Sequence, residues 1–98
     1  MDNDVFNTAL PPFMAEEALV QIKRSLRDLK LAERGIGFEL RGKRIVELTG
    51  DASRITAKLA RKPALTPQWD TLTIKSTGDQ RKLVDEVKKR LARWDQED

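Results

Sequence analysis

Two short groups of residues contain the side-chain types that acid–base or nucleophilic chemistry uses. The stretch TGDAS, residues 49–53, holds Asp51 and Ser53 after an apolar, alternating segment, and Asp85 and Glu86 are adjacent carboxylates. Gly, Asp and Ser are ordinary turn formers, and neighbours in a helix do not face each other to share a metal ion or a proton. The sequence therefore predicts a turn and two surface carboxylates at these places.

The residue types that are missing exclude further chemistry. The 98 residues contain no Cys, no His and no Tyr. Disulfides, thiolate or imidazole catalysis and Cys/His zinc sites are therefore excluded. We expect a protein that is not an enzyme and has no cofactor, no metal ion and no small-molecule substrate.

Positive charge is the feature that points to a partner. The chain has 19 cations and 16 acids, a net charge of +3. Residues 1–17 and 95–98 contain seven of the acids and no cation, so residues 18–94 carry a net charge of +10. A field of one sign attracts polyanions and acidic proteins.

Eight cations are candidates for polyanion binding. Four of them recur at spacings of 4, 3 and 4 on one flank of a predicted helix: Lys23, Arg27, Lys30 and Arg34. Four more come from the predicted sheet and its turns: Arg41, Arg54, Lys58 and Lys75. Like charges at helical spacing weaken a helix slightly, so a partner would explain the stripe. A solvated flank, whose methylene stems cover the apolar face, would also explain it and is the preferred interpretation, although both stay open.

Two helices are expected to position these residues. The segment 11–34 has an apolar residue at every third or fourth position and ends before Gly35. The segment 76–94 repeats this spacing, with Ser76 or Thr77 as its cap. Such spacing places the apolar side chains on one face of each helix.

Between the helices, alternation predicts strands. Residues 36–40 and 46–48 form a hairpin whose three-residue loop, Gly42–Arg44, pairs Leu40 with Val46 and Phe38 with Leu48. This register turns Ile36 toward the core and Ile45 toward solvent. Residues 71–76 form the last strand, supported by their Thr and Ile content.

Residues 52–61 fit two templates. As a strand they pair Leu48 with Ile55 and Val46 with Ala57, whereas as a helix they would begin at Asp51 and end before Pro63. We prefer the strand. The predicted fold is α+β, a two-layer sandwich in which a four-stranded antiparallel meander carries both helices on one face, in the order α-β-β-β-β-α. The alternative order is α-β-β-α-β-α.

The predicted core draws on both helices and the sheet. It consists of Leu26, Phe38, Val46, Leu48, Ile74, Val87 and Leu91. Trp94 is expected in the core and Trp69 as a cover over its open end, since tryptophan usually buries most of its area.

The chain is expected to contain a single domain. Residues 1–12 form a mobile segment, residues 13–94 the α+β domain and residues 95–98 an acidic tail. No stretch resembles a signal peptide or a membrane span, so we expect a cytoplasmic protein that does not bind a membrane.

The leading functional hypothesis is a small non-enzymatic module that binds a protein partner through charged surfaces. The alternative is non-specific nucleic-acid binding by the basic first helix and the sheet face, where phosphate contacts would supply the affinity. The predicted outer sheet face has no aromatic residue on which a base could stack, so base-specific RNA recognition is not expected.

Overall fold

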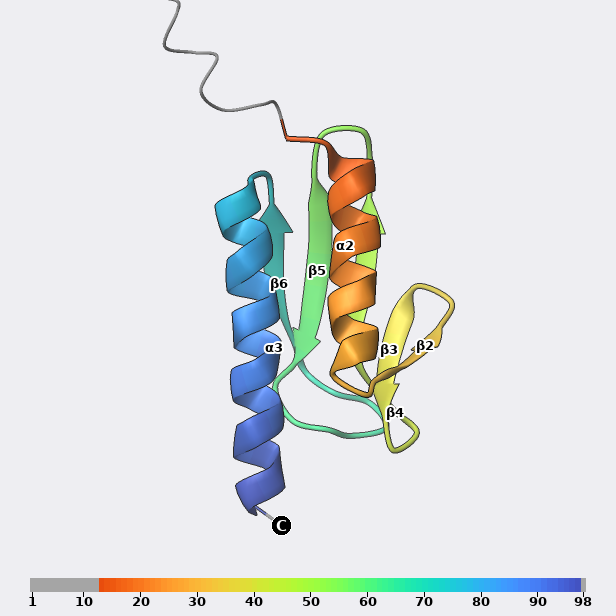
Figure 1. The fold of residues 1–98 in the computed structure, drawn as a ribbon. Coiled ribbons are helices and arrows are strands. Elements are labelled where there is room, and N and C mark those ends of the chain that lie inside the picture. Colours follow the sequence, from red (N-terminus) through yellow and green to blue (C-terminus); the bar gives the residue numbers. More distant parts are fainter. Residues whose placement is uncertain (1–12, 98) are drawn as a thin grey trace, which may run out of the picture.

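The computed structural model describes residues 13–97, in which it has two helices and five strands. In chain order they are α2 (Ala15–Asp28), β2 (Ala32–Arg34), β3 (Gly37–Leu40), β4 (Lys43–Gly50), β5 (Ile55–Ala60), β6 (Trp69–Ile74) and α3 (Thr77–Glu97). The strands form one antiparallel sheet in the order β2-β3-β4-β5-β6, and both helices lie on the same face of it (Figure 1). The predicted α+β class is confirmed, but the predicted number of strands is wrong. The predicted mobile segment 1–12 lies outside the described residues.

The first helix ends at Asp28, earlier than predicted. After it, Lys30 has a left-handed backbone conformation with a φ of 71°. The Lys30 N–H donates to the carbonyl of Arg27 at 2.9 Å, and the Leu31 N–H donates to the carbonyl of Leu26 at 3.3 Å. This pair of bonds is the Schellman motif, which satisfies the last carbonyls of a helix, and buried Leu26 and Leu31 complete it.

The early end of α2 creates the fifth strand. Glycine is the usual residue at the left-handed position of a Schellman motif, so a lysine there gives no sequence signal and the prediction ran on to Gly35. Residues 32–34 pair with β3 instead of forming a last helical turn. The predicted four-residue basic stripe is therefore wrong as a helical feature, because Lys30 and Arg34 lie outside α2.

The β2–β3 hairpin turns at Gly35 and Ile36, between the paired residues Arg34 and Gly37. Gly35 has a φ of 61°, as the first central position of a type II′ turn requires. Ile36 is 48% exposed at this turn. Its predicted place in the core is wrong.

The β3–β4 hairpin turns at two residues, Arg41 and Gly42, and not at the predicted loop Gly42–Arg44. Their φ angles are 54° and 82°, and a type I′ turn needs a positive φ at both positions. Leu40 therefore pairs with Lys43. The sequence interpretation failed because an arginine at the first turn position does not signal a positive φ.

A β-bulge in β4 shifts the pairing register by one residue after this turn. Phe38 pairs with Val46 while Glu39 pairs with Arg44, so Ile45 is an extra residue in β4. The two consecutive residues Ile45 and Val46 are both buried. A bulge allows this, because it interrupts the strict alternation of a strand. The predicted outward position of Ile45 is therefore wrong.

Residues 55–60 form strand β5, so the strand interpretation of this segment is confirmed and the helical alternative is wrong. Its predicted register is displaced, since Leu48 pairs with Ala57 and Gly50 with Ile55. The displacement is an even number of residues, so every side chain keeps its predicted face. For this reason the core residues could be right while their partners were wrong.

Helix α3 begins with a reciprocal cap. The Asp79 N–H donates to Ser76 Oγ at 3.1 Å, and the Lys75 N–H donates to Asp79 Oδ2 at 3.0 Å. The first bond satisfies an N–H in the first turn of α3, and the second satisfies the N–H of the residue before the N-cap. The helix runs through Glu97, so the acidic residues Asp95 and Glu97 extend α3 rather than follow it.

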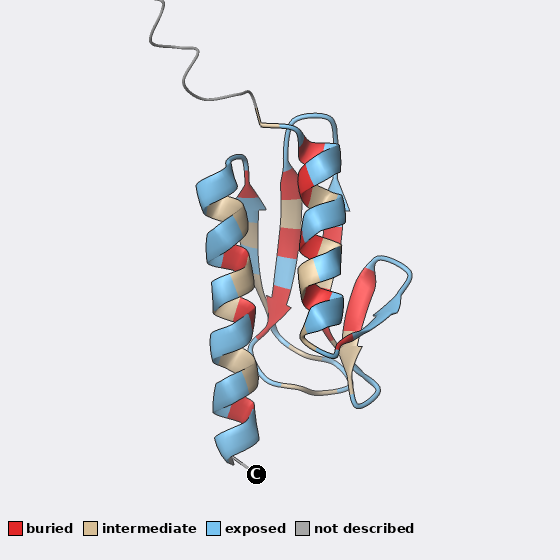
Figure 2. Cartoon of the chain, in the orientation of Figure 1, coloured by how far each residue is buried: buried red, intermediate tan, exposed pale blue. Residues whose placement is uncertain are grey.

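The core fills the space between the helices and the sheet (Figure 2). Of the predicted core residues, Leu91 is half-buried and the rest are buried: Leu26, Phe38, Val46, Leu48, Ile74 and Val87. Trp94 is buried as predicted, and Trp69 is half-buried against the core.

Candidate functional site

The eight candidate cations are spread over the molecule. They lie on α2 (Lys23, Arg27), in the turn after it (Lys30), on β2 (Arg34), in the β3–β4 turn (Arg41), in the β4–β5 turn (Arg54), on β5 (Lys58) and directly after β6 (Lys75). The β3–β4 and β4–β5 turns are at opposite ends of β4, so Arg41 and Arg54 are at opposite ends of the sheet. The eight therefore do not form one surface.

The two candidates on α2 share a counter-ion on the neighbouring edge strand. Arg27 Nη1 donates to Glu33 Oε1 at 2.6 Å, and Lys23 Nζ lies 3.6 Å from Glu33 Oε2. Glu33 is in β2, the strand that replaces the predicted end of the helix. The helical stripe is thus reduced to two cations that a carboxylate partly neutralises.

Two further candidates have carboxylate partners. Arg34 Nε lies 3.6 Å from Glu39 Oε2, and Arg54 Nε lies 3.8 Å from Asp51 Oδ2. Arg34 and Arg54 are largely exposed, so these pairs add little to stability, but they lower the local positive field.

The TGDAS segment is a hydrogen-bonded turn. Asp51 Oδ1 accepts from the Ser53 N–H at 2.8 Å, from the Arg54 N–H at 3.0 Å and from Ser53 Oγ at 3.1 Å. The backbone N–H of Ser53, more than any other donor, holds the pKa of Asp51 below its usual value. The carboxylate and hydroxyl that sequence analysis considered for chemistry thus bond to each other and to the turn itself.

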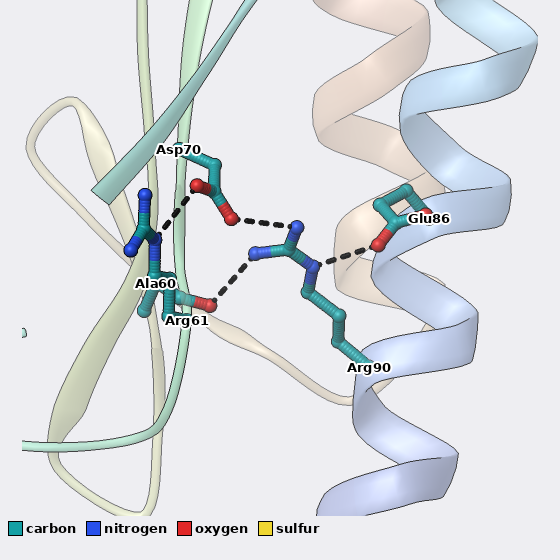
Figure 3. Close-up of polar contacts among 5 residues, drawn as sticks. All are labelled: Ala60, Arg61, Asp70, Glu86 and Arg90. Carbon is teal, nitrogen blue, oxygen red and sulfur yellow. Dashed lines mark hydrogen bonds and ion pairs between the residues drawn. The ribbon is translucent and has the colours of Figure 1, made fainter. Parts of the chain in front are cut away.

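A dense polar cluster joins α3 to the start of β6 (Figure 3). Arg90 Nε donates to Glu86 Oε2 at 2.8 Å, its Nη2 donates to Asp70 Oδ2 at 2.9 Å, and its Nη1 donates to the Ala60 carbonyl at 3.1 Å. Arg61 Nε donates to the second oxygen of Asp70 at 2.8 Å. The Arg90 side chain is only 14% exposed, so it joins a helix and two strands largely away from water.

The charges of this cluster stabilise one another. Hydrogen bonds from Arg61, and then from Arg90, hold the pKa of Asp70 below its usual value. Burial works against the charge of Arg90, but the hydrogen bonds to Glu86 and Asp70 outweigh it and raise its pKa. Since Asp70 binds two guanidinium groups and Arg90 has three acceptors, the cluster is a structural support for α3.

Sequence analysis named one residue of this cluster, Glu86, and only as a surface carboxylate. The missed residue is Asp70. It stands two positions before Leu72 and so falls on the helix-facing side of β6, where an acid must find a partner. That unusual position was the available signal.

A groove opens at the end of the molecule where both helices finish, with a volume of about 600 Å³. Its more buried lining is apolar and comes from the C-cap of α2, from β3, from the β5–β6 loop and from α3: Leu29, Leu40, Pro63, Leu91 and Trp94. Its exposed lining has three cations and one acid: Arg41, Lys43, Lys62 and Asp95. We call this the helix-end groove. Only Arg41 belongs to the predicted set, because the fold and not the sequence brings the β3–β4 turn beside Lys62.

Trp94 gives the helix-end groove a polar feature. Its side chain is buried, and its indole N–H has no acceptor among the described residues. A buried donor without an acceptor costs about 1 to 3 kcal/mol. An acceptor that reached it would recover this free energy.

Comparison with protein-family models, with curated proteins and with solved structures found no match. Within residues 13–97, no group of three or more acidic side chains is arranged to hold a metal ion. In the same part of the chain, neither helix has the length and apolar character to cross a membrane.

Proposed function

We propose that the protein is a non-enzymatic interaction module that binds an acidic segment of a protein partner in the helix-end groove. The observation that carries the proposal is the composition of this groove, an apolar floor with three cations above it. Apolar side chains of the segment would rest on Leu40, Leu91 and Trp94, and its carboxylates would face Lys43 and Lys62.

Charge favours this surface over the other basic ones. At the flank of α2 a carboxylate already neutralises the cations, since Glu33 lies within ion-pair distance of Lys23 and Arg27. The helix-end groove places Lys43 and Lys62 beside apolar side chains, and one acid, Asp95, also lines it. A partner that combines negative charge with apolar side chains gains from both parts of this surface.

A fluorescence anisotropy titration tests the proposal. The probe is a labelled peptide of alternating Glu, Leu and Phe residues, and its control replaces every Glu by Lys. Reversal of two groove cations, in the double variant Lys43→Glu/Lys62→Glu, should weaken binding about tenfold, because each exposed charge contributes up to about 1 kcal/mol. The matched control, Lys75→Glu/Lys88→Glu, changes the net charge equally outside the groove and should stay near wild type.

The nucleic-acid alternative is tested on the same proteins with a labelled DNA duplex at low and moderate salt. Equal loss of peptide binding in both double variants would contradict a groove site, because it would show attraction by net charge alone. Duplex binding that is tighter than peptide binding and falls steeply with salt would favour the alternative.

A further inference from the structure

We propose that the outer edge of β6 binds an extended segment of a partner protein, which adds to the sheet as a further strand between β6 and α3. This inference is independent of the helix-end groove, because none of its residues lines that groove. It rests on which backbone groups of β6 point outward, on the wall that α3 forms beside it, and on the length of β6, which has six residues with no proline and no bulge.

The ladder between β5 and β6 shows which backbone groups are unused. The Arg61 N–H donates to the Gln68 carbonyl at 2.9 Å, just beyond the paired strands. Hydrogen-bonded pairs alternate along an antiparallel ladder, so Leu72 and Ile74 also bond to β5. The N–H and carbonyl groups of Thr71 and Thr73 therefore point away from β5. Within residues 13–97 no other strand pairs with β6.

The ladder between β4 and β5 leads to the same assignment of outward backbone groups. The Asp51 N–H donates to the Arg54 carbonyl at 2.9 Å, so the pairs Thr49–Thr56 and Glu47–Lys58 are the hydrogen-bonded ones between β4 and β5. Residues 55, 57 and 59 of β5 are then left to bond β6. Both ladders agree that the outward groups of β6 belong to its odd-numbered residues.

Helix α3 forms one wall of a groove along this edge. It runs along β6 at the outer side of the sheet (Figure 1). Between strand and helix lies a groove of about 510 Å³, which we call the edge groove. Leu72 lines it on the strand side and Lys82, Asp85 and Lys89 line it on the helix side. An added strand would direct every second side chain into this groove and bond to Thr71 and Thr73 through its backbone.

An extended peptide fits the edge groove better than a second copy of this chain. A two-fold axis between two β6 strands would lie about 2.4 Å beyond each, because paired strands are about 4.8 Å apart. Packed helices need about 8 to 10 Å between their axes. Since α3 follows the outer side of β6, two copies of it would collide at such an axis. A segment without a helix avoids the collision.

Charge indicates the side chains of the segment. On α3, Lys82, Asp85 and Lys89 are three and four residues apart and so share one face of the helix. The other charged residues that line the edge groove, Asp70, Glu86 and Arg90, are bonded to one another. The two cations and one acid that are left favour an acidic residue among the helix-facing positions of the ligand. Apolar or threonine side chains suit the position beside Leu72, which is half-buried.

The test uses backbone-blocked peptides on the full chain. The probe is an acetylated and amidated peptide of alternating Thr, Glu and Val residues, with one version N-methylated at the odd positions and another at the even positions. Strand addition uses the N–H groups of one set only, so one version should lose binding at least tenfold and the other should bind like the unmodified peptide. Amide hydrogen exchange, measured by NMR, should slow at Thr71 and Thr73 when the peptide is bound.

A proline variant gives a second readout. Thr71→Pro removes an outward N–H that β5 does not use, so it should fold and lose peptide binding, whereas Thr71→Val should keep both. Equal binding of the two N-methylated peptides, or no binding of any peptide at millimolar concentration, would overturn the proposal. So would Thr71 and Leu72 amides that are equally protected in the unliganded chain. Protection at Thr71 that rises with protein concentration would show that a second copy occupies the edge. Chemical-shift changes of the protein that are confined to the helix-end groove when the peptide is added would overturn the edge proposal and support the proposed function alone.

Discussion

The two edges of the sheet are built differently. Strand β2 has three residues, all exposed, and two of them, Glu33 and Arg34, are charged and in ion pairs. Strand β6 has six residues, no proline and no bulge, and its charged residue, Asp70, is held by two arginines on the helix-facing side. Short length and outward charge protect an edge from pairing with another chain, and only β2 has them.

This difference teaches where the molecule can accept a strand. At the β2 edge, an added strand would find few backbone groups and would displace the pairs of Glu33 with α2. At the β6 edge, the N–H and carbonyl groups of Thr71 and Thr73 point outward, and the Asp70 carboxylate already has its partners inside the fold. The β6 edge is therefore the one at which a further strand would disrupt fewer existing contacts.

The largest effect on stability is expected from the arginines that connect the edge strands to the helices. Arg90 connects α3 to β6, and Arg27 connects α2 to β2. Arg90 is 14% exposed and has three acceptors, whereas Arg27 is 50% exposed and bonds to Glu33. Arg90→Met keeps the stem but leaves a carboxylate and a carbonyl without their donor, so the free energy of unfolding should fall by about 2 kcal/mol. Arg27→Met should cost less than about 1 kcal/mol, as exposed ion pairs do. Urea unfolding of both variants measures this. Equal losses would mean that both edges are held alike.

A smaller effect concerns acid. The pKa of Asp70 is lowered in the folded chain, chiefly by Arg61. Its charged form therefore stabilises the fold above the usual carboxyl pKa of about 3.9, and this stabilisation is lost as the pH falls through the lowered value. Asp70→Asn should flatten the fall in unfolding free energy on the acid side of pH 4. In Arg90→Met the loss of unfolding free energy with falling pH should be reduced only in part, because Arg61 still donates to Asp70. An unchanged acid limb in Asp70→Asn would show that β6 is not held by this charge.

The sequence predicts the buried faces of the helices and strands well, because these faces follow from the spacing of apolar residues along each element. The alternation around Leu48, Ala57 and Ile74 identified the buried face of three strands, and a register displaced by an even number of residues leaves this face unchanged. The spacing of Leu26 and Val87 likewise identified the buried faces of both helices.

The features that the sequence did not predict depend on single backbone conformations or on distant residues. Lys30 and Arg41 have positive φ angles that their residue types do not signal, and they set the end of α2 and the β3–β4 turn. The helix-end groove joins Lys43 and Lys62 to the end of α3, which only the assembled fold brings together. The basic stripe failed for the same reason as the helix end, because it assumed that Arg34 was helical.

The smallest expected effect concerns how the chain enters the β2 edge. Lys30 is left-handed, a conformation that costs a residue with a Cβ atom about 1 kcal/mol relative to glycine. Lys30→Gly relieves this strain and gives up some entropy of the unfolded chain, so the free energy of unfolding should rise by about 0.5 kcal/mol. The matched control is Asp28→Gly, where the backbone is helical and glycine should cost about 0.5 kcal/mol. Opposite signs in urea unfolding are expected. A loss in both variants would mean that the turn into β2 does not depend on the left-handed residue, and that β2 is held by its ion pairs with α2 instead.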